Sequence, residues 1–228
     1  MLQKLKFKEW SPQQNYYFVS CLHFGHDREF IYKPRGYNNI VEHDEGIIAK
    51  WNENITSNDI VFSIGDNVFG YNADKRLEEY FRRLNFNTLY ISPGNHYSGY
   101  HQLYKKFQEE LYGVDDIEIV PLRYKFTETK TIVFVPNYYE IYIGNQALVL
   151  CHYPIFPHNG AGKGVWGIFG HCHGKNEKTN IRTGTGKVID VCIESMGRPI
   201  SYPEIANIFK HRASEDVGHH TDKTTYAI

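Results

Sequence analysis

Five short apolar runs of the chain are each followed directly by polar side chains that can bind metal ions. The groups that follow them are Cys21-Leu22-His23, Gly65-Asp66-Asn67, Pro93-Gly94-Asn95-His96, Cys151-His152-Tyr153-Pro154 and Gly170-His171-Cys172-His173. Taken singly, each group has an ordinary explanation, because glycine and asparagine are common in turns. Together they would bury an Asp, an Asn and several His side chains, which costs several kcal/mol unless a partner replaces the lost hydration. Divalent metal ions are such partners, so the sequence predicts a metal site.

The spacing of the candidate ligands supports coordination. Cys21 and His23 are two residues apart, and so are His171 and His173. In an extended chain, residues two apart point to the same side, so each pair could direct two ligands to one point while the residue between them points away. Glycines beside three of the groups permit tight turns and close approach to a crowded centre. They are Gly65, Gly94 and Gly170. Mixed His, Asp and Asn ligands suit Zn, Fe, Mn or Co rather than Ca.

The elements that position these groups can be predicted from the apolar pattern. Strands are expected at 16–20, 60–64, 89–92, 132–135, 140–143, 147–151, 168–170 and 188–193. Helices are expected at 42–53, 74–84, 99–111 and 203–211. Strand and helix alternate in the first half, and the second half is mostly strand. This order predicts an α/β or α+β domain in which helices cover the sheets and binding groups lie on loops at strand ends.

Composition and charge limit the classes of function. The chain has 228 residues, 41% of them hydrophobic, which is enough for one sizeable domain with a large core. The formal net charge of -1 gives no field that would collect nucleic acid or an anionic membrane, and no extended nucleic-acid track is evident. No run is long enough to span a bilayer, and the first ten residues lack the apolar core of a signal peptide. We therefore expect a cytoplasmic protein.

The cysteines and the C-terminal segment support the same interpretation. The four cysteines are far apart and lie in apolar segments, so a reduced state is expected. Three of them, Cys151, Cys172 and Cys192, are expected to be small buried side chains. Beyond residue 211 the sequence is mostly polar and loses its periodicity. We expect one domain at 1–211 and a mobile tail at 212–228, with His219 and His220 solvated in the tail.

Six motifs in a fixed order indicate a family. They are LHFGH, GDNVFG, PGNH, CHYPI, GHCHG and RPISYPEI. In this order they resemble the calcineurin-like metallophosphoesterases, above all the small single-domain bacterial and phage-type members, over nearly the whole chain from about residue 16 to 209. The resemblance implies a four-layer α-β-β-α sandwich of two mixed sheets flanked by helices, with a dinuclear metal centre at the strand ends. It also implies a hydrolase acting on phosphate esters, with phosphodiesters slightly preferred over monoesters.

The resemblance also assigns roles to residues. Two divalent transition metal ions, Mn, Fe, Zn or Co, would occupy the site. The first would be held by Cys21, His23, Asp66 and His173, and the second by Asp66, Asn95, His152 and His171. Asp66 would bridge them, because a carboxylate has two oxygens. His96 would lie over the scissile phosphate as general acid or orienting group, and a metal-bridging hydroxide would attack in line without a covalent enzyme intermediate.

Two positions depart from the family pattern, which normally has Asp at position 21 and often an acidic residue at position 97. This sequence has Cys21 and Tyr97 there. As a thiolate, Cys21 keeps the negative charge of Asp but is a softer ligand, which favours Zn or Fe at the first site. Three interpretations stay open: Cys21 is a ligand, it is a bystander beside a weakened first site, or it is the remnant of an inactive site.

Contacts with the substrate are less clearly indicated. His26 and Arg28 follow the first motif and could meet a phosphate or a leaving group, as Asn95 and His96 would by resemblance. For His26 and Arg28 an ordinary surface position is an equal alternative. The expected substrate is a small phosphate ester or a nucleotide. The alternative functions are a non-catalytic metal-binding scaffold of the same fold and a nuclease acting on polymeric DNA or RNA. The oligomeric state is left open.

Overall fold

The computed structural model describes residues 4–7, 15–70, 72–113 and 121–214. Within these ranges the strands form two mixed sheets. The first sheet has six strands in the order β11 (Ile200–Ser201), β2 (Tyr16–Val19), β3 (Ile60–Ile64), β4 (Thr88–Ser92), β6 (Thr131–Phe134) and β5 (Leu122–Lys125). The second sheet has five strands in the order β1 (Lys4–Phe7), β7 (Tyr138–Ile143), β8 (Gln146–Cys151), β9 (Trp166–Phe169) and β10 (Val188–Asp190).

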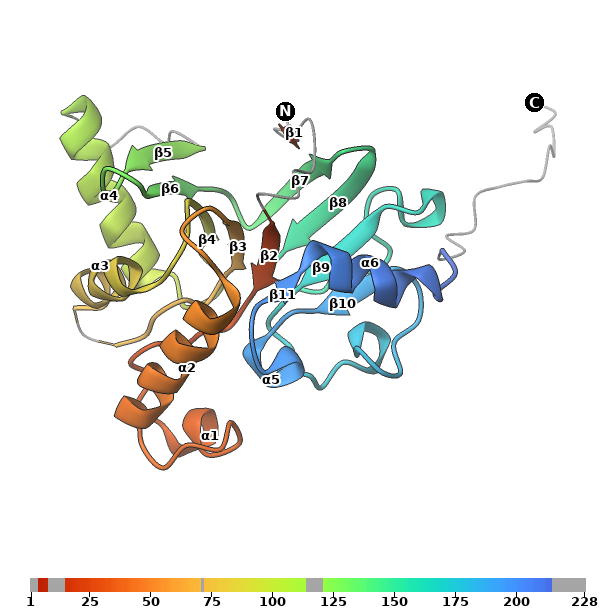
Figure 1. Ribbon diagram of the computed structural model, residues 1–228, viewed down its shortest axis with the longest axis horizontal. Helices are drawn as coiled ribbons and strands as arrows, with labels where there is room; N and C mark the ends of the chain where they lie inside the picture. The colour runs from red at the N-terminus through yellow and green to blue at the C-terminus, as the bar shows by residue number, and fades with distance from the viewer. Residues whose placement is uncertain (1–3, 8–14, 71, 114–120, 215–228) are drawn as a thin grey trace, which may run out of the picture.

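Six α-helices lie in the described ranges. They are α1 (Glu29–Tyr32), α2 (Ile40–Asn54), α3 (Ala73–Arg83), α4 (Ser98–Tyr112), α5 (Ile193–Met196) and α6 (Tyr202–Lys210). Figure 1 shows α2, α3 and α4 on the side of the first sheet, and α5 and α6 near the strands β9 and β10. Short 3-10 turns occur at Ala161–Lys163 and Glu177–Thr179. The predicted α/β class, with two mixed sheets and helices, is confirmed.

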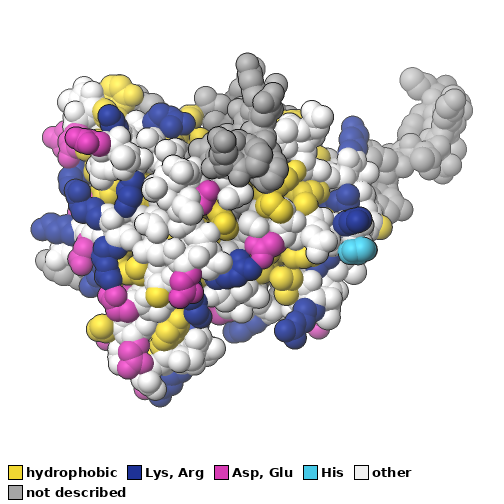
Figure 2. Space-filling view, in the orientation of Figure 1, with side chains coloured by type: hydrophobic (Ala, Val, Ile, Leu, Met, Phe, Trp, Pro, Cys, Tyr) yellow, Lys and Arg dark blue, Asp and Glu magenta, His cyan; other side chains and the backbone are white. Residues whose placement is uncertain are grey.

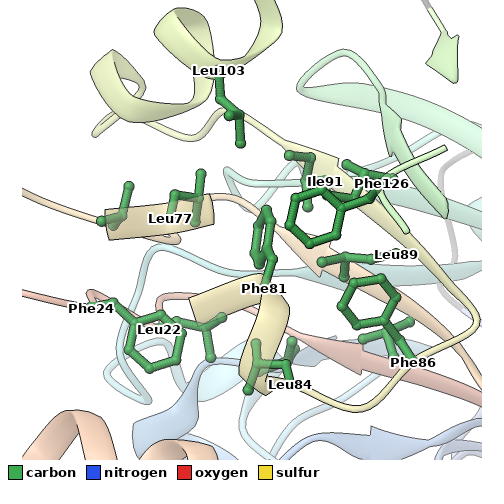
Figure 3. Packing of buried hydrophobic residues seen from close by; sticks show 14 of the residues in the cluster. Leu22, Phe24, Leu77, Phe81, Leu84, Phe86, Leu89, Ile91, Leu103 and Phe126 are labelled. Carbon is green, nitrogen blue, oxygen red and sulfur yellow. The ribbon is translucent and has the colours of Figure 1, made fainter. Parts of the chain in front are cut away.

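One hydrophobic core lies between the first sheet and its helices. Leu77 and Phe81, four residues apart on α3, are fully buried on one side of the helix. They pack in a single cluster with Leu89 and Ile91 of β4, whereas Tyr90, between those two residues, belongs to the core on the opposite face. Figure 3 shows the side chains of α3 and β4 meeting in this layer. The alternation along the strand therefore gives each face of the first sheet its own core.

A second core fills the space between the two sheets. Phe18, Phe62 and Tyr90 lie side by side on β2, β3 and β4, and their ring centroids are 5.2 and 4.9 Å apart. They pack in one cluster with Ile141 and Leu150 of the second sheet. A fully buried side chain of this size contributes about 1.5–3 kcal/mol through removal of apolar surface from water. This core fixes the position of one sheet against the other.

The outer face of the second sheet carries a smaller cluster. Val149 and Phe169 are packed there against Ile155, Phe156 and Val165 from the segment between β8 and β9. Helix α6 contributes its buried residues to the core between the sheets instead. The glycine-rich segment 160–167 therefore helps to cover a sheet and continues directly into β9.

The carboxyl ends of the parallel strands meet at one edge of the molecule. β2, β3 and β4 are parallel to one another in the first sheet, and β8 is parallel to β9 in the second. The two sheets are joined at this edge by a parallel bridge between Ser20 and Cys192. The amide of Ser20 donates to the carbonyl of Val191 at 3.0 Å, and the amide of Ile193 donates to the carbonyl of Ser20 at 3.2 Å. Five loops from two sheets therefore start close together.

Each of the eight predicted strands and four predicted helices corresponds to an observed element, with ends that differ by a few residues. The elements that were not predicted, β1, β11, α1 and α5, contain two to four residues each. Another short element, β5, lies in a stretch that resembles strand in sequence, and it is an antiparallel edge strand on which Arg123 and Lys125 are exposed. Such short edge elements lack the long apolar pattern that sequence analysis detects.

The predicted tail begins with a residue that is attached to the domain. Arg212 donates through Nη1 to the carbonyl of Val188 at 2.7 Å and through Nη2 to the carbonyls of Asn180 and Ile181 at 2.7 and 3.0 Å. Arg212 is therefore held against the domain by three hydrogen bonds. Residues 215–228, with His219 and His220, lie outside the described part of the chain.

Surface features bear on the predicted partners. Within the described residues, no helix combines the length and apolar composition needed to cross a membrane. On the face seen in Figure 2, acidic and basic side chains are interspersed, without a continuous basic stripe over the described residues. This agrees with the near-neutral net charge of the chain.

Candidate metal centre

The loops that carry the candidate ligands have an unusual backbone conformation. Positive φ angles occur at Cys21 (57°), His23 (53°), Asp66 (55°), His171 (69°) and His173 (49°). This left-handed region costs roughly 1–2 kcal/mol for most residues other than glycine, and such strain is concentrated at functional sites. Asn72 is the single other non-glycine residue with positive φ in the described part of the chain. The expectation of extended ligand pairs is therefore wrong, because the strands end earlier and the chain turns within each loop.

Backbone hydrogen bonds and glycines hold these loops together. The amide of Cys21 donates to the carbonyl of Gly65 at 3.1 Å, and the amide of His23 donates to that of Asp66 at 3.0 Å. Gly94 has a φ of 75°, and a Cβ atom there would lie 2.3 Å from Oδ1 of Asp66. The predicted close approach of backbone to the site at this glycine is confirmed. No other residue type would fit without displacing the carboxylate.

Asp66 lies at the centre of the site and is 1% exposed. Its Oδ2 is 3.3 Å from Nε2 of His152 and 3.9 Å from Nε2 of His23. Its Oδ1 accepts a hydrogen bond from the amide of His96 at 2.8 Å. Burial alone would raise the pKa of Asp66, but the hydrogen bond and charge of His152, together with the hydrogen bond from the amide of His96, outweigh burial and lower the pKa. Asp66 is therefore a buried carboxylate that faces histidines from both sheets.

Asn95, His152 and His171 form one ligand group. Oδ1 of Asn95 is 2.9 Å from Nε2 of His152 and 2.9 Å from Nδ1 of His171. Nδ1 of His152 lies 2.9 Å from the carbonyl of Ile64, to which it can only donate. In the neutral ring, Nε2 then carries a lone pair that faces the oxygens of Asn95 and Asp66. Acceptors that face one another require a proton or a cation between them, which fits a metal ion.

Cys21, His23 and His173 form the other ligand group. Nε2 of His23 and Nε2 of His173 are 3.3 Å apart, and Sγ of Cys21 lies within 4.8 Å of a ring nitrogen of each. Nδ1 of His173 binds Oε1 of Glu194 at 2.6 Å, which turns Nε2 towards the group. Burial alone would raise the pKa of Cys21, but hydrogen bonds with Cys192, His173 and His23 bring it well below its usual range. A thiolate with two imidazoles is a donor set that fits Zn or Fe.

The two histidines of the GHCHG motif contact different groups. His171 reaches Asn95, whereas His173 reaches His23. The expectation that they direct ligands to one point is therefore wrong, because both residues have positive φ and the loop turns between them. The seven candidate ligands are nevertheless brought together. Sγ of Cys21 also lies within 4.8 Å of donor atoms of Asp66 and His152, and the division of the seven between two ions stays a prediction.

The cysteines differ in their surroundings. Sγ of Cys21 is fully buried, accepts from the amide of His171 at 3.3 Å, and is 3.2 Å from Sγ of Cys192. Cys192 is buried, as predicted, although it contacts the site. Cys151 is buried on the outer face of the second sheet. Cys172 is only partly buried, which corrects the prediction, because the turn of the loop exposes it. All four cysteines are free.

His96 stands beside the two ligand groups. One of its ring nitrogens lies within 4.8 Å of donor atoms of His23 and Asp66. The ring also meets Phe69 edge to face, with centroids 5.0 Å apart. Burial lowers the pKa of His96. The charge of Asp66 raises it by less, so the pKa is lowered overall. The next residue, Tyr97, is 59% exposed. His96 is therefore within reach of a group bound at the centre, either as a ligand or as a proton donor.

His26 and Arg28 have different environments. His26 is buried and stacks on Phe69, with ring centroids 3.9 Å apart, and its Nδ1 is 3.3 Å from Nδ1 of His23. Burial, with the nearby charge of His23, lowers the pKa of His26 to about 4, so its ring is neutral near pH 7. A surface position for His26 is therefore wrong. Arg28 is exposed.

Two residues next to the site were not predicted from the sequence. Glu194 contacts His173, and Arg35 donates through Nε to Oε1 of the same carboxylate at 2.8 Å. A weak signal existed for Glu194, since it is an acidic residue directly after an apolar run that ends at Ile193. Arg35 lies in a polar loop between α1 and α2, where nothing in the sequence distinguishes it from a surface cation.

Comparison with known proteins gives the fold but no activity. No protein-family profile matches the chain. An uncharacterized protein of Methanocaldococcus jannaschii is 32% identical over 80 residues, and the match spans 35% of this chain and 45% of that protein. A crystal structure of a protein of unknown function from Aquifex aeolicus matches with a TM-score of 0.54 at 19% identity, over 86% of this chain and 99% of that chain. At this level of identity the second match establishes a shared fold only.

Proposed function

We propose that this protein is a dinuclear metal-dependent phosphoesterase, similar to the calcineurin-like metallophosphoesterases, that hydrolyses phosphate esters with a slight preference for diesters. The observation that carries the proposal is the gathering of donor side chains from five loops of two sheets around Asp66. His23, His96 and His152 lie near its carboxylate, and the loop of His171 and His173 contacts Asn95 and His23. The proposal includes the four-layer α-β-β-α sandwich that the resemblance implies. The M. jannaschii and A. aeolicus proteins neither support nor oppose the activity.

The donor atoms fit two divalent ions. Cys21, His23 and His173 would hold one ion, Asn95, His152 and His171 the other, and Asp66 would be shared. When bound, such ions polarise phosphate oxygens and activate water. The site holds its negative charge on buried side chains, since the pKa values of Asp66 and Cys21 are lowered. Burial lowers the pKa of His173, but hydrogen bonds with Cys21 and Glu194 raise it to about 10. Without metal a proton therefore supplies part of the positive charge that these anions require, and a metal ion held by Nε2 would replace that proton.

His96 is the residue best placed to handle a proton of the reaction. Its amide orients the shared carboxylate, and its ring lies beside the donor atoms without a strong hydrogen bond to either group. A neutral imidazole near pH 7 can orient a phosphate oxygen, and its protonated form can donate to a leaving alkoxide. His26 stays neutral behind His23 and supports that ring. We assign the substrate contact to His96 and not to His26.

A small phosphate ester or a nucleotide is the proposed substrate. The net charge of -1 and the interspersed charges on the face seen in Figure 2 favour a small molecule over polymeric DNA or RNA. The free cysteines are in keeping with a reducing compartment, and we propose a cytoplasmic protein.

The proposal is tested by metal analysis followed by assays. The protein is purified without chelators, its metal content is measured by elemental analysis, and hydrolysis of aryl phosphomonoesters and phosphodiesters is measured with Mn, Fe, Co and Zn. We expect two equivalents of metal and metal-dependent hydrolysis, with both lost in Asp66→Asn. Bound metal without hydrolysis of any ester would support a non-catalytic scaffold. Cleavage of single-stranded DNA or RNA in preference to the small diesters would support a nuclease.

A further inference from the structure

A nearly inaccessible guanidinium lies next to the first ligand group. The side chain of Arg35 is 2% exposed, and that of Glu194, with which it forms an ion pair, is 17% exposed. Burying such a pair gains little stability, because the loss of hydration offsets the attraction between the charges. Oε2 of Glu194 is moreover buried without a hydrogen-bond partner among the described residues. Stability alone therefore does not explain why the ion pair of Arg35 and Glu194 is buried here.

Glu194 fixes the orientation of one ligand. Its Oε1 lies 2.6 Å from Nδ1 of His173 and accepts from Nε of Arg35 at 2.8 Å. A carboxylate on Nδ1 holds the proton there and turns Nε2 towards the metal position, which raises the basicity of the ligand. Glu194 follows β10 of the second sheet, and so reaches His173 from the same sheet.

Arg35 fixes the loop that carries the other two ligands of the same group. Its Nη2 donates to the carbonyl of Cys21 at 2.9 Å, and its Nη1 donates to the carbonyl of Leu22 at 2.9 Å. These carbonyls belong to the loop in which both Cys21 and His23 have positive φ. One guanidinium therefore ties the strained loop of the first sheet to the carboxylate that orients the ligand from the second sheet.

A second contact continues from Arg35 to the far end of this loop. Nη1 of Arg35 lies 2.7 Å from Nε2 of His43, and Nδ1 of His43 lies 2.7 Å from Oδ1 of Asp44. Oδ2 of Asp44 accepts from the amide of Gly25 at 2.9 Å. The loop is thus held at residues 21, 22 and 25 by one connected network.

The two ligand groups differ in their surroundings. In the first group Cys21 and His23 are 0% and 2% exposed and the side chain of His173 is 26% exposed, whereas in the second group His152 is buried but Asn95 and His171 are exposed. We propose that Arg35 and Glu194 are positioning residues that preorganise the first ligand group, so that it binds its metal ion more tightly than the group of Asn95 and His171. The inference rests on the dinuclear site of the proposed function. The second ion is then the exchangeable one.

The test measures metal binding rather than hydrolysis. Zn²⁺ alone is titrated into metal-free protein by equilibrium dialysis, and bound metal is measured by elemental analysis. We expect two equivalents with different dissociation constants. His173→Ala should remove the tighter equivalent and Asn95→Ala should weaken the looser one, which assigns each constant to its group. The reverse assignment, or two equal constants, would overturn the inference.

The positioning role is tested with conservative variants. Glu194→Gln and Arg35→Lys should each weaken the tighter site by roughly 10- to 100-fold, the usual effect of removing a partner of a metal ligand, and leave the looser site unchanged. Glu194→Asp should recover part of the loss. The matched control is Glu204→Gln, which breaks the ion pair with Arg198 away from the site and should leave both constants unchanged. Unchanged binding in Glu194→Gln, or equal weakening of both sites, would overturn the role.

Further measurements distinguish a failure of the positioning role from misfolding of a variant and from failure of the proposed function. Circular dichroism and thermal unfolding of the metal-free variants show whether each one is folded, and Glu194→Gln, which keeps the shape of the side chain, serves if Arg35→Lys does not fold. If the wild type binds two ions in the expected order and hydrolyses no ester, the proposed function fails while the inference stands. If the wild type binds fewer than two ions, the inference fails.

Discussion

Cys21 is the candidate ligand at which the sequence departs most from the pattern of the family that it resembles. Its sulfur is fully buried, lies beside His23 and His173, and contacts the sulfur of Cys192. Its lowered pKa favours the thiolate, the form that binds metals. This environment is consistent with a ligand, and the three interpretations of Cys21 differ in the metal preference that they predict.

Replacing the thiolate by a carboxylate tests these interpretations. Cys21→Asp should raise the ratio of Mn-supported to Zn-supported activity by about tenfold, because a hard ligand of equal charge replaces a soft one, and tenfold corresponds to about 1.4 kcal/mol. The control Cys151→Ala removes a buried sulfur on the outer face of the second sheet and should leave the ratio unchanged. An unchanged ratio in Cys21→Asp would identify the cysteine as a bystander.

His96 is expected to act on the substrate rather than to hold metal. His96→Ala should lower turnover by roughly 10²- to 10⁴-fold, the usual contribution of a positioned acid or base, while the metal content stays at the wild-type level. Elemental analysis and steady-state kinetics on the same preparation measure both quantities. Tyr97→Phe, at the exposed neighbouring position, is the control and should have little effect. Loss of metal from His96→Ala would instead make His96 a ligand.

At the residue scale, the ligand types could be predicted but their orientations could not. All seven candidates lie close together in the structure. They could be predicted because polar, metal-binding residue types directly after strands are informative from the sequence alone. The pairing of His171 with Asn95 and of His173 with His23 depends on positive φ angles, which sequence does not encode for histidine. Arg35 was missed because burial of a loop arginine depends on the whole fold.

At the scale of elements, the turns after the strands determine whether the donors meet. Gly94→Ala should remove bound metal, because its Cβ would lie 2.3 Å from Oδ1 of Asp66. Gly144→Ala is a matched control, since Gly144 also has positive φ, 58°, but beyond its two chain neighbours no described atom lies within 4 Å of its added Cβ. Both variants should lose about 1–2 kcal/mol of stability through the backbone conformation. Equal metal content in the two would contradict a role for Gly94 in the site.

Helix α6 begins with a capping box whose acidic residue predicts a pH effect. Glu204 accepts from the amide and hydroxyl of Ser201, at 2.9 and 2.6 Å, and pairs with Arg198. Burial alone would raise the pKa of Glu204, but the hydrogen bonds with Arg198 and Ser201 lower it to about 2. Its stabilising contribution is therefore complete above the unfolded-state value of about 4.3 and is lost as the pH falls towards 2.

The measurement compares urea unfolding at pH 7 and pH 3. Wild-type protein should lose more unfolding free energy between these pH values than Glu204→Gln, which cannot ionise. The difference is expected to be small, because the side chain of Glu204 is 41% exposed and solvent screens the pair. The same fall in both proteins would exclude Glu204 as a source of the pH dependence.

Long elements could be predicted because the apolar pattern repeats several times within them, as it does in α3 around Leu77 and Phe81. The two-residue strand β11 and the one-turn helix α5 contain too few residues for any period. Residues 191–193 were predicted as strand because they are apolar, yet Ile193 opens α5. Strand β10 ends at Asp190, and Cys192 pairs with Ser20 of the first sheet instead of continuing the pairing within the second sheet.

At the scale of the whole molecule, the candidate ligands come from both sheets, so metal bound by them should stabilise the fold. At a free metal concentration about 100 times its dissociation constant, one site adds about 2.7 kcal/mol. Chelation should therefore lower the unfolding temperature by roughly 5–10 °C for a domain of this size. Calorimetry with and without EDTA measures the shift, and metal restores it. Asp66→Asn should unfold at one temperature in both buffers, and a chelator-sensitive Asp66→Asn would place the metal elsewhere.

The edges of the first sheet determine what can attach to it. Arg123 and Lys125 are exposed on β5, so a strand from another chain that paired there would bring its side chains against two cations. The opposite edge strand, β11, has two residues and offers few free backbone groups for pairing. Charged and short edge strands are the common means by which sheets avoid aggregation. The six-stranded sheet is therefore protected at both ends against growth by strand addition, whether or not metal is bound.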